Sequence, residues 1–103
     1  MIARTWRGRA VAAKAKAYER HFADNVLPEQ KSLRGHRGAY LLRTEANGIV
    51  EFTAVTLWES CDAIKAFAGA DISRAHVEPQ ARAVLSDFDA HAEHYEVVIS
   101  AVP

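Results

Sequence analysis

The chain has little of what marks several classes of protein: it has one cysteine, Cys61, and no net charge, because 13 Lys and Arg residues balance 13 Asp and Glu residues. One cysteine excludes an internal disulfide and is typical of a reducing compartment, so we expect a cytoplasmic protein. No basic run is long enough to indicate binding to nucleic acid. No stretch reaches 18 consecutive apolar residues, and the opening MIARTWRGR lacks the apolar segment of a signal peptide, so neither a membrane span nor export is expected.

The apolar residues that are present are enough for one folded unit. Hydrophobic residues make up 50% of the 103 residues, and the chain has no internal repeat, low-complexity segment or linker. A chain of this length forms one domain with one modest core. The sequence therefore predicts a single domain over residues 1–103.

Hydrophobic periodicity predicts the elements of that domain. Alternating apolar residues are typical of strands, and apolar residues spaced by three and four are typical of helices. Gly8 and Arg9 are expected to turn the chain after the first strand, and Pro28 to end or kink the first helix or to open a further turn. The predicted order is strand, helix, strand, strand, helix, strand: Ile2–Arg7, Ala10–Leu27, Ala39–Thr44, Ile49–Trp58, Cys61–Ala68 and Tyr95–Ile99.

Short local signals mark where these elements begin and end. The dipeptide Asn47-Gly48, between two strand patterns, predicts a hairpin. Ser60 is expected to cap the helix that follows it, and Gly69 to close that helix in the left-handed conformation. Beyond it, Asp71 is expected to cap a short helical turn that carries His76.

The order of the elements predicts an α+β fold. A βαββαβ order is the ferredoxin-like arrangement, a four-stranded antiparallel sheet with helices on one face. The strands predicted for Ala39–Thr44 and Ile49–Trp58 carry apolar or β-branched residues on both faces. Because monomers rarely leave a contiguous apolar sheet face in water, we expect a second copy to cover it. The result would be a homodimer whose two sheets close into an α+β barrel.

The chain also resembles a known family. The segments that carry the resemblance are the opening MIARTWRGR, the strand RGAYLLR over residues 37–43 and above all LWESCDAIKAFAGADISRAHVEP over residues 57–79. Over essentially its whole length the chain resembles the dimeric α+β barrel proteins, specifically the antibiotic-biosynthesis-monooxygenase-like group. The resemblance implies a homodimer with a pocket between the sheet and the helices of each subunit.

A function follows from the resemblance. The superfamily includes cofactor-free oxygenases of polyketide phenols and heme-degrading monooxygenases. We therefore expect a small cofactor-independent monooxygenase that acts on an aromatic or polycyclic small molecule. The alternatives are a non-enzymatic small-molecule-binding or accessory dimer, and a divergent heme-binding or heme-degrading protein. Heme is disfavoured, because the first-strand Asn and helix-two Trp of the heme-degrading branch fall here on Trp6 or Arg7 and on Phe67, and only His76 lies near the position of the ligand.

Five residues are the candidates for this chemistry. His76 is the expected catalytic base, since a neutral imidazole takes a proton from an acidic phenol. Tyr40 is the expected donor to the negative charge that develops. Trp6, Trp58 and Phe67 are the expected walls of an apolar substrate pocket. The simpler alternatives, a helix-end histidine and core aromatics, stay open.

The remaining chemistry-bearing residues indicate no further site. His91 and His94 have the spacing HxxH, but they precede a strand and lack a third ligand, so we expect them to be exposed and expect no metal site. Cys61 begins a helix with no base nearby in the sequence. His36, in a basic loop, is the next candidate base after His76.

Overall fold

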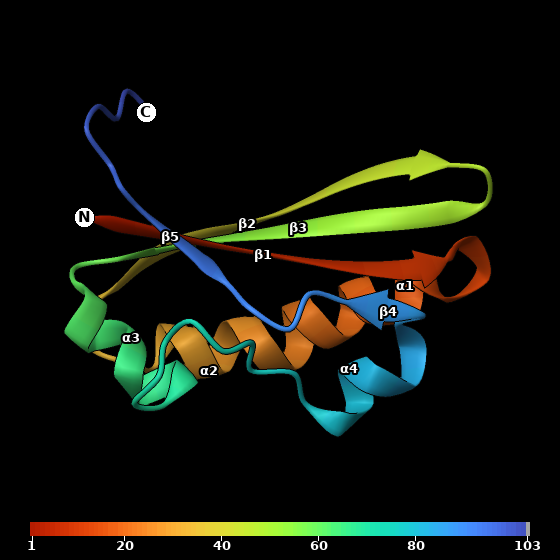
Figure 1. The fold of residues 1–103 in the computed structure, drawn as a ribbon, viewed down its shortest axis with the longest axis horizontal. Coiled ribbons are helices and arrows are strands. Elements are labelled where there is room, and N and C mark those ends of the chain that lie inside the picture. The colour runs from red at the N-terminus through yellow and green to blue at the C-terminus, as the bar shows by residue number, and fades with distance from the viewer. Residues whose placement is uncertain (103) are drawn as a thin grey trace.

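The computed structural model describes residues 1–102 and shows the predicted ferredoxin-like α+β fold. Its five strands form one sheet in the order β2-β3-β1-β4, with β5 also paired to β1. All pairings are antiparallel, and every helix lies on the same side of the sheet (Figure 1). The elements in chain order are β1 (Ile2–Val11), α1 (Ala12–His21), the π-helical turn η1 (Phe22–Val26), α2 (Leu27–Lys31), β2 (His36–Ala46), β3 (Ile49–Trp58), α3 (Cys61–Ala68), α4 (Pro79–Val84), β4 (Asp87–Phe88) and β5 (Glu93–Glu96).

The first strand is longer than predicted, so the turn expected at Gly8 and Arg9 is wrong. β1 pairs with β3 without interruption from Ile2, opposite Trp58, to Val11, opposite Ile49. The ladder of backbone hydrogen bonds to β3 overrides the turn preference of a single glycine.

The last strand differs from the prediction as well. Two short strands, β4 and β5, share the same edge of β1: Phe88 pairs with Gly8, and Glu96 pairs with Ile2. Ile99, which was predicted to belong to the closing strand, is 86% exposed and lies outside it.

The first helix continues through Pro28 by way of a wider turn. Proline has no N–H, so it cannot make an ordinary α-helical bond to the residue four positions earlier. Just before it, the Leu27 N–H donates to the Phe22 carbonyl, one residue further back than in an α-helix. η1 therefore carries the helix past the proline into α2, which is the expected further turn.

The predicted hairpin, helix cap and helix end are confirmed. Asn47 and Gly48 have φ angles of 54° and 76° and connect β2 to β3 as a tight hairpin. The Ser60 hydroxyl accepts from the Ala63 N–H at 3.2 Å and caps α3. Gly69 closes that helix with a φ of 88°.

The helical turn expected after Asp71 is wrong. Asp71 accepts from the Ser73 N–H at 3.1 Å in a tight turn, and His76 lies in the coil beyond it.

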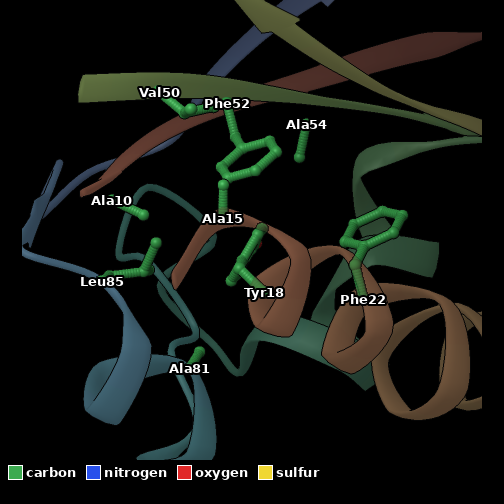
Figure 2. Close-up of a cluster of buried hydrophobic side chains, with 9 residues drawn as sticks. All are labelled: Ala10, Ala15, Tyr18, Phe22, Val50, Phe52, Ala54, Ala81 and Leu85. Atoms are coloured by element: carbon green, nitrogen blue, oxygen red, sulfur yellow. The ribbon is translucent and has the colours of Figure 1, made fainter. Parts of the chain in front are cut away.

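The core lies between the sheet and α1 and α4 (Figure 2). The rings of Tyr18 from α1 and Phe52 from β3 pack with centroids 4.9 Å apart. The buried cluster consists of Ala10, Ala15, Tyr18, Phe22, Val50, Phe52, Ala54, Ala81 and Leu85.

None of the helices within residues 1–102 has the length and apolar character needed to cross a membrane.

Within residues 1–102, no helix covers the opposite face of the sheet (Figure 1). Alternation along β2 turns Ala39 and Leu41 toward the core and leaves Tyr40 and Leu42 outside. Tyr40 and Leu42 are 47% and 50% exposed, and Tyr95 of β5 is 51% exposed. The bare face therefore exposes large apolar side chains, as the sequence predicted, although Arg7 and Arg9 of β1 and Glu51 of β3 lie on the same face.

Replacing Gly8 with alanine is expected to lower the free energy of unfolding by about 1–3 kcal/mol. A Cβ at this position would lie 2.9 Å from Cη2 of Trp6 and 3.2 Å from Cδ1 of Leu85. The indole has little freedom to move away, because its Nε1 donates to the Asp89 carbonyl at 2.8 Å. Urea denaturation measures the change. The same substitution should cost less in a Trp6→Phe background, and an equal cost in both backgrounds would contradict this origin.

Candidate functional site

A pocket lies between the helix-facing side of the sheet, the segment α1-η1-α2 and the coil that precedes α4. The space inside it is about 60 Å³. Its apolar and aromatic lining comes from Trp6, Tyr18, Phe22, Val26, Ala54, Phe67, Val77 and Ala81. Its polar lining comes from Arg4, His21, Gln30, Thr56, His76 and Glu78.

The pairing of the central strands brings the floor of this pocket together. Alternate residues of a strand share a face, so Arg4 and Trp6 of β1 both point toward the helices. The register sets Arg4 opposite Thr56 and Trp6 opposite Ala54 of β3. These four side chains lie under α1 and its continuation.

Two of the predicted wall residues, Trp6 and Phe67, line the pocket. The indole of Trp6 is fixed by its bond to the Asp89 carbonyl, and its ring centroid is 6.5 Å from that of Tyr18. Burial raises the pKa of the Tyr18 hydroxyl well above its usual range, so this ring is neutral. The pocket therefore has rigid, uncharged aromatic walls.

The other two predicted residues, Trp58 and Tyr40, lie elsewhere. Trp58 is fully buried behind Phe67, with ring centroids 6.1 Å apart, and its Nε1 donates to the Thr56 hydroxyl at 2.9 Å. It is a core residue that supports the pocket wall without lining the pocket. Tyr40 projects from the bare face of the sheet, so its hydroxyl cannot reach a ligand in this pocket. Because alternate residues of β2 point to opposite faces, Tyr40 and His76 lie on opposite sides of the sheet.

His76 lies at the edge of the pocket, where it is exposed. Its ring meets that of Phe67 edge-on at a centroid distance of 4.9 Å. The side-chain donor atoms of Glu29, His76 and Glu78 all lie within 4.8 Å of one another. Neither carboxylate forms a hydrogen bond or an ion pair with His76 among the described residues. The three groups are also of kinds that bind divalent metal ions, but Glu29 and His76 are exposed, and exposed acidic groups commonly gather without an ion.

Arg4 is a buried cation, and no carboxylate pairs with it within residues 1–102. It is 5% exposed, its Nη2 donates to the Arg74 carbonyl at 3.0 Å, and its Nε is buried without a hydrogen-bond partner. Burial lowers its pKa to about 10, so the guanidinium still carries its charge at neutral pH. Arg4 therefore brings a positive charge with unused hydrogen-bonding capacity to the pocket.

His21 and Gln30 bring two more buried polar groups. The Asn25 side-chain amide lies 3.1 Å from Nδ1 of His21. If the amide nitrogen donates there, as the structure places it, the proton of the neutral imidazole is on Nε2. That Nε2 and the Oε1 of Gln30 are both buried without a partner among the described residues. Both residues line the pocket, and each has a buried polar atom that the described residues leave without a partner.

Sequence reasoning missed these three polar residues for different reasons. Arg4 had a signal, because it shares one strand face with the large apolar residues Ile2 and Trp6, and charged residues are rare on a buried face. His21 had a weaker one, three residues after Tyr18 on the buried side of α1. Gln30 had no such signal, because the π-helical turn η1 changes which residues share a face of the helix after it.

The histidines outside the pocket also depart from expectation. His91 is exposed as predicted, but His94 is half-buried, because it pairs with Arg4 on the helix-facing side. Burial, together with the charge of Arg4, lowers the pKa of His94. His36 is half-buried against the edge of Trp58, 5.1 Å between centroids, and burial lowers its pKa as well. Neither lines the pocket, and Cys61 is exposed at the start of α3.

Comparison with known proteins identifies the class to which this fold and pocket belong. The family model for antibiotic biosynthesis monooxygenases matches residues 1–79. Because the match spans most of the chain, the protein belongs to the antibiotic biosynthesis monooxygenase family. No protein of curated function matches the sequence.

Solved structures show the same fold at low sequence identity. A Bacillus cereus protein assigned to antibiotic biosynthesis monooxygenases has 16% identity and a TM-score of 0.67, with 100% of this chain and 96% of that chain covered. The heme-degrader MhuD from Mycobacterium tuberculosis, solved with two hemes, has 23% identity and a TM-score of 0.64, with 99% and 100% covered. A monooxygenase from Streptomyces coelicolor, solved with nanaomycin D, has 12% identity and a TM-score of 0.62, with 99% and 91% covered.

Replacing Arg4 with methionine is expected to raise the free energy of unfolding by about 1–3 kcal/mol at neutral pH. The pKa of Arg4 is lower in the folded chain than in the unfolded one, so the folded state disfavours the charged form at every pH below about 10. An apolar side chain of similar length removes that penalty. Urea denaturation measures the gain, and Arg20→Met, at an exposed position on α1, should change stability by less than about 0.5 kcal/mol. A loss of stability in Arg4→Met would contradict the assignment.

Proposed function

We propose that the protein is a small monooxygenase that oxidises an aromatic small molecule without a cofactor. The observation that carries the proposal is the meeting of two histidines with different surroundings at one aromatic-walled pocket. His76 is exposed at the edge beside two carboxylates, and His21 is buried with an unpartnered Nε2. We assign His76 as the base and His21, in place of Tyr40, as the hydrogen-bond donor.

The chemistry needs little from the protein, because the substrate supplies the electrons. His76 takes the proton of a phenol hydroxyl, and a ring carbon of the phenolate then bonds to O₂. The O–O bond breaks as that carbon loses its hydrogen, which leaves one oxygen as a C=O group and the other as water. One phenol and one O₂ thus give one quinone and one water. The His21 N–H donates to the phenolate oxygen and stabilises its charge.

Heme does not fit the pocket as it is formed. Pockets for ligands of drug size hold about 300–1,000 Å³, and the space here is about 60 Å³. The coil that contributes His76 is held to the segment between β4 and β5, because Ala75 N–H donates to the Ala90 carbonyl at 2.9 Å and Ala92 N–H to the Ser73 carbonyl at 2.8 Å. The proposed reaction therefore has no step through heme.

The proposal includes a homodimer formed through the bare face of the sheet. Tyr40, Leu42 and Tyr95 are each about half exposed there, and a second sheet packed on this face would bury them. A stable interface buries roughly 1,200 Å² or more in total. On β2, Leu41 packs against the core, so Leu42 is the leucine that would reach the partner.

His76→Ala is expected to lower the rate of O₂ uptake by about 10²–10⁴-fold, the usual contribution of a positioned base. An oxygen electrode with a panel of phenols and anthrones measures it, with EDTA present so that stray metal ions do not contribute. His91→Ala removes a second exposed histidine that does not line the pocket and should leave the rate unchanged.

Two results would contradict this assignment. If no substrate of the panel gives O₂ uptake above the protein-free control, the chain is better explained as a binding or accessory protein. If uptake occurs and His76→Ala retains it, the base lies elsewhere, and His21 is then the histidine of the pocket to test.

Leu42→Arg is expected to convert the dimer to a monomer, because a charge at this position would be buried between two sheets without a partner. Light scattering at micromolar concentration gives the mass directly. Ala13→Arg places the same charge on an exposed position of α1 and should leave the dimer intact. A wild-type protein of monomer mass, or a Leu42→Arg variant of dimer mass, would refute the proposed interface.

A further inference from the structure

The proposed oxidation does not use the most unusual group in the pocket, the guanidinium of Arg4. Arginine is almost never fully buried unless it is paired. Arg4 is 5% exposed and lines the pocket, yet no carboxylate lies within salt-bridge distance of it in residues 1–102. A buried charge of this kind destabilises the fold, and groups that destabilise a fold are retained where function needs them.

A second arginine on the same strand shows what a paired one looks like in this protein. Arg9 donates to Asp87 at 2.6 Å, to Asp89 at 2.8 Å and to Glu51 at 3.3 Å. It lies on the more exposed side of β1, where pairing contributes least. Arg9 thus pairs with three carboxylates, whereas the more deeply buried Arg4 pairs with none among the described residues.

We propose that Arg4 binds the carboxylate of the ligand, so that the pocket takes an aromatic carboxylic acid. This inference rests on the proposed function for the aromatic character of the substrate. The guanidinium edge made by Nε and Nη2 matches a carboxylate with two parallel hydrogen bonds. Nε is unpartnered, and Nη2 has a second hydrogen beyond the one donated to the Arg74 carbonyl.

The rest of the pocket complements such a ligand. The uncharged rings of Trp6 and Phe67 suit the aromatic part, and the Nε2–H of His21 suits a phenol or carboxylate oxygen. A neutral analogue would leave the charge of Arg4 buried and unpaired, which is how a site rejects a ligand that lacks the matching group.

The test compares 4-hydroxybenzoate with its methyl ester, two ligands that differ in the charge of one group. Titration calorimetry under anaerobic conditions measures binding alone, so its outcome does not depend on turnover. The acid is expected to bind about 10–100-fold more tightly than the ester, the ratio that hydrogen bonds to a charged group supply. Arg4→Gln should reduce this preference to near one while the ester binds as before.

Two further variants keep the test decisive. Arg20→Gln removes a charge from an exposed position of α1 and should retain the full preference for the acid. Arg4→Lys keeps the charge but loses the two parallel N–H groups of the guanidinium, so it should retain part of the preference for the acid. If Arg4→Gln fails to fold, the comparison rests on Arg4→Lys, and an unchanged preference in that variant would overturn the proposal.

The other outcomes are equally clear. Equal binding of acid and ester by the wild type, an unchanged preference in Arg4→Gln, or no binding of either ligand at millimolar concentration would each overturn the inference. Tight, Arg4-dependent binding of the acid without O₂ uptake would uphold this inference and defeat the proposed oxidation. Uptake with neutral phenols and no preference for the acid would do the reverse.

Discussion

The ten-residue pairing of β1 with β3 is the constraint on which the rest of this structure depends. It runs from Ile2 to Val11 in one register, and side chains of a strand alternate between two faces. Arg4 and Trp6 therefore lie under the helices, and Arg7 lies on the bare side. A shift of one residue would exchange the two faces and remove both pocket residues. The pocket exists because the register is strictly held.

The same alternation gives the sheet two different surfaces. The helix-facing side holds the core around Tyr18 and Phe52 and, next to it, the pocket. The other side presents Tyr40 and Leu42 without any element to cover them. One layer of helices covers only one face of the sheet, so the apolar residues on the other face stay exposed. The homodimer proposed above would bury these exposed residues.

Much of the fold could be predicted from the sequence because its signals are local. The Asn47-Gly48 hairpin, the Ser60 cap and the Gly69 helix end depend on backbone conformations that these residues favour by themselves. The predictions that failed involve partners far away in the sequence. Gly8 does not turn because β3 pairs with it. The unpredicted strand β4 forms because Asp87 and Phe88 pair with the far end of β1, on the edge that β5 also uses.

The candidate site likewise combines residues that the sequence could single out with residues that only the tertiary structure brings together. Residue type and periodicity were enough to single out Trp6, Phe67 and His76, which the structure brings to one pocket, and to predict the order of the strands and helices. Tertiary structure decided that Tyr40 faces away and that Arg4 and His21 face inward. Periodicity shows which residues share a face, but which face the helices cover, and whether a buried charge finds a partner there, depends on elements that meet only when the chain is folded.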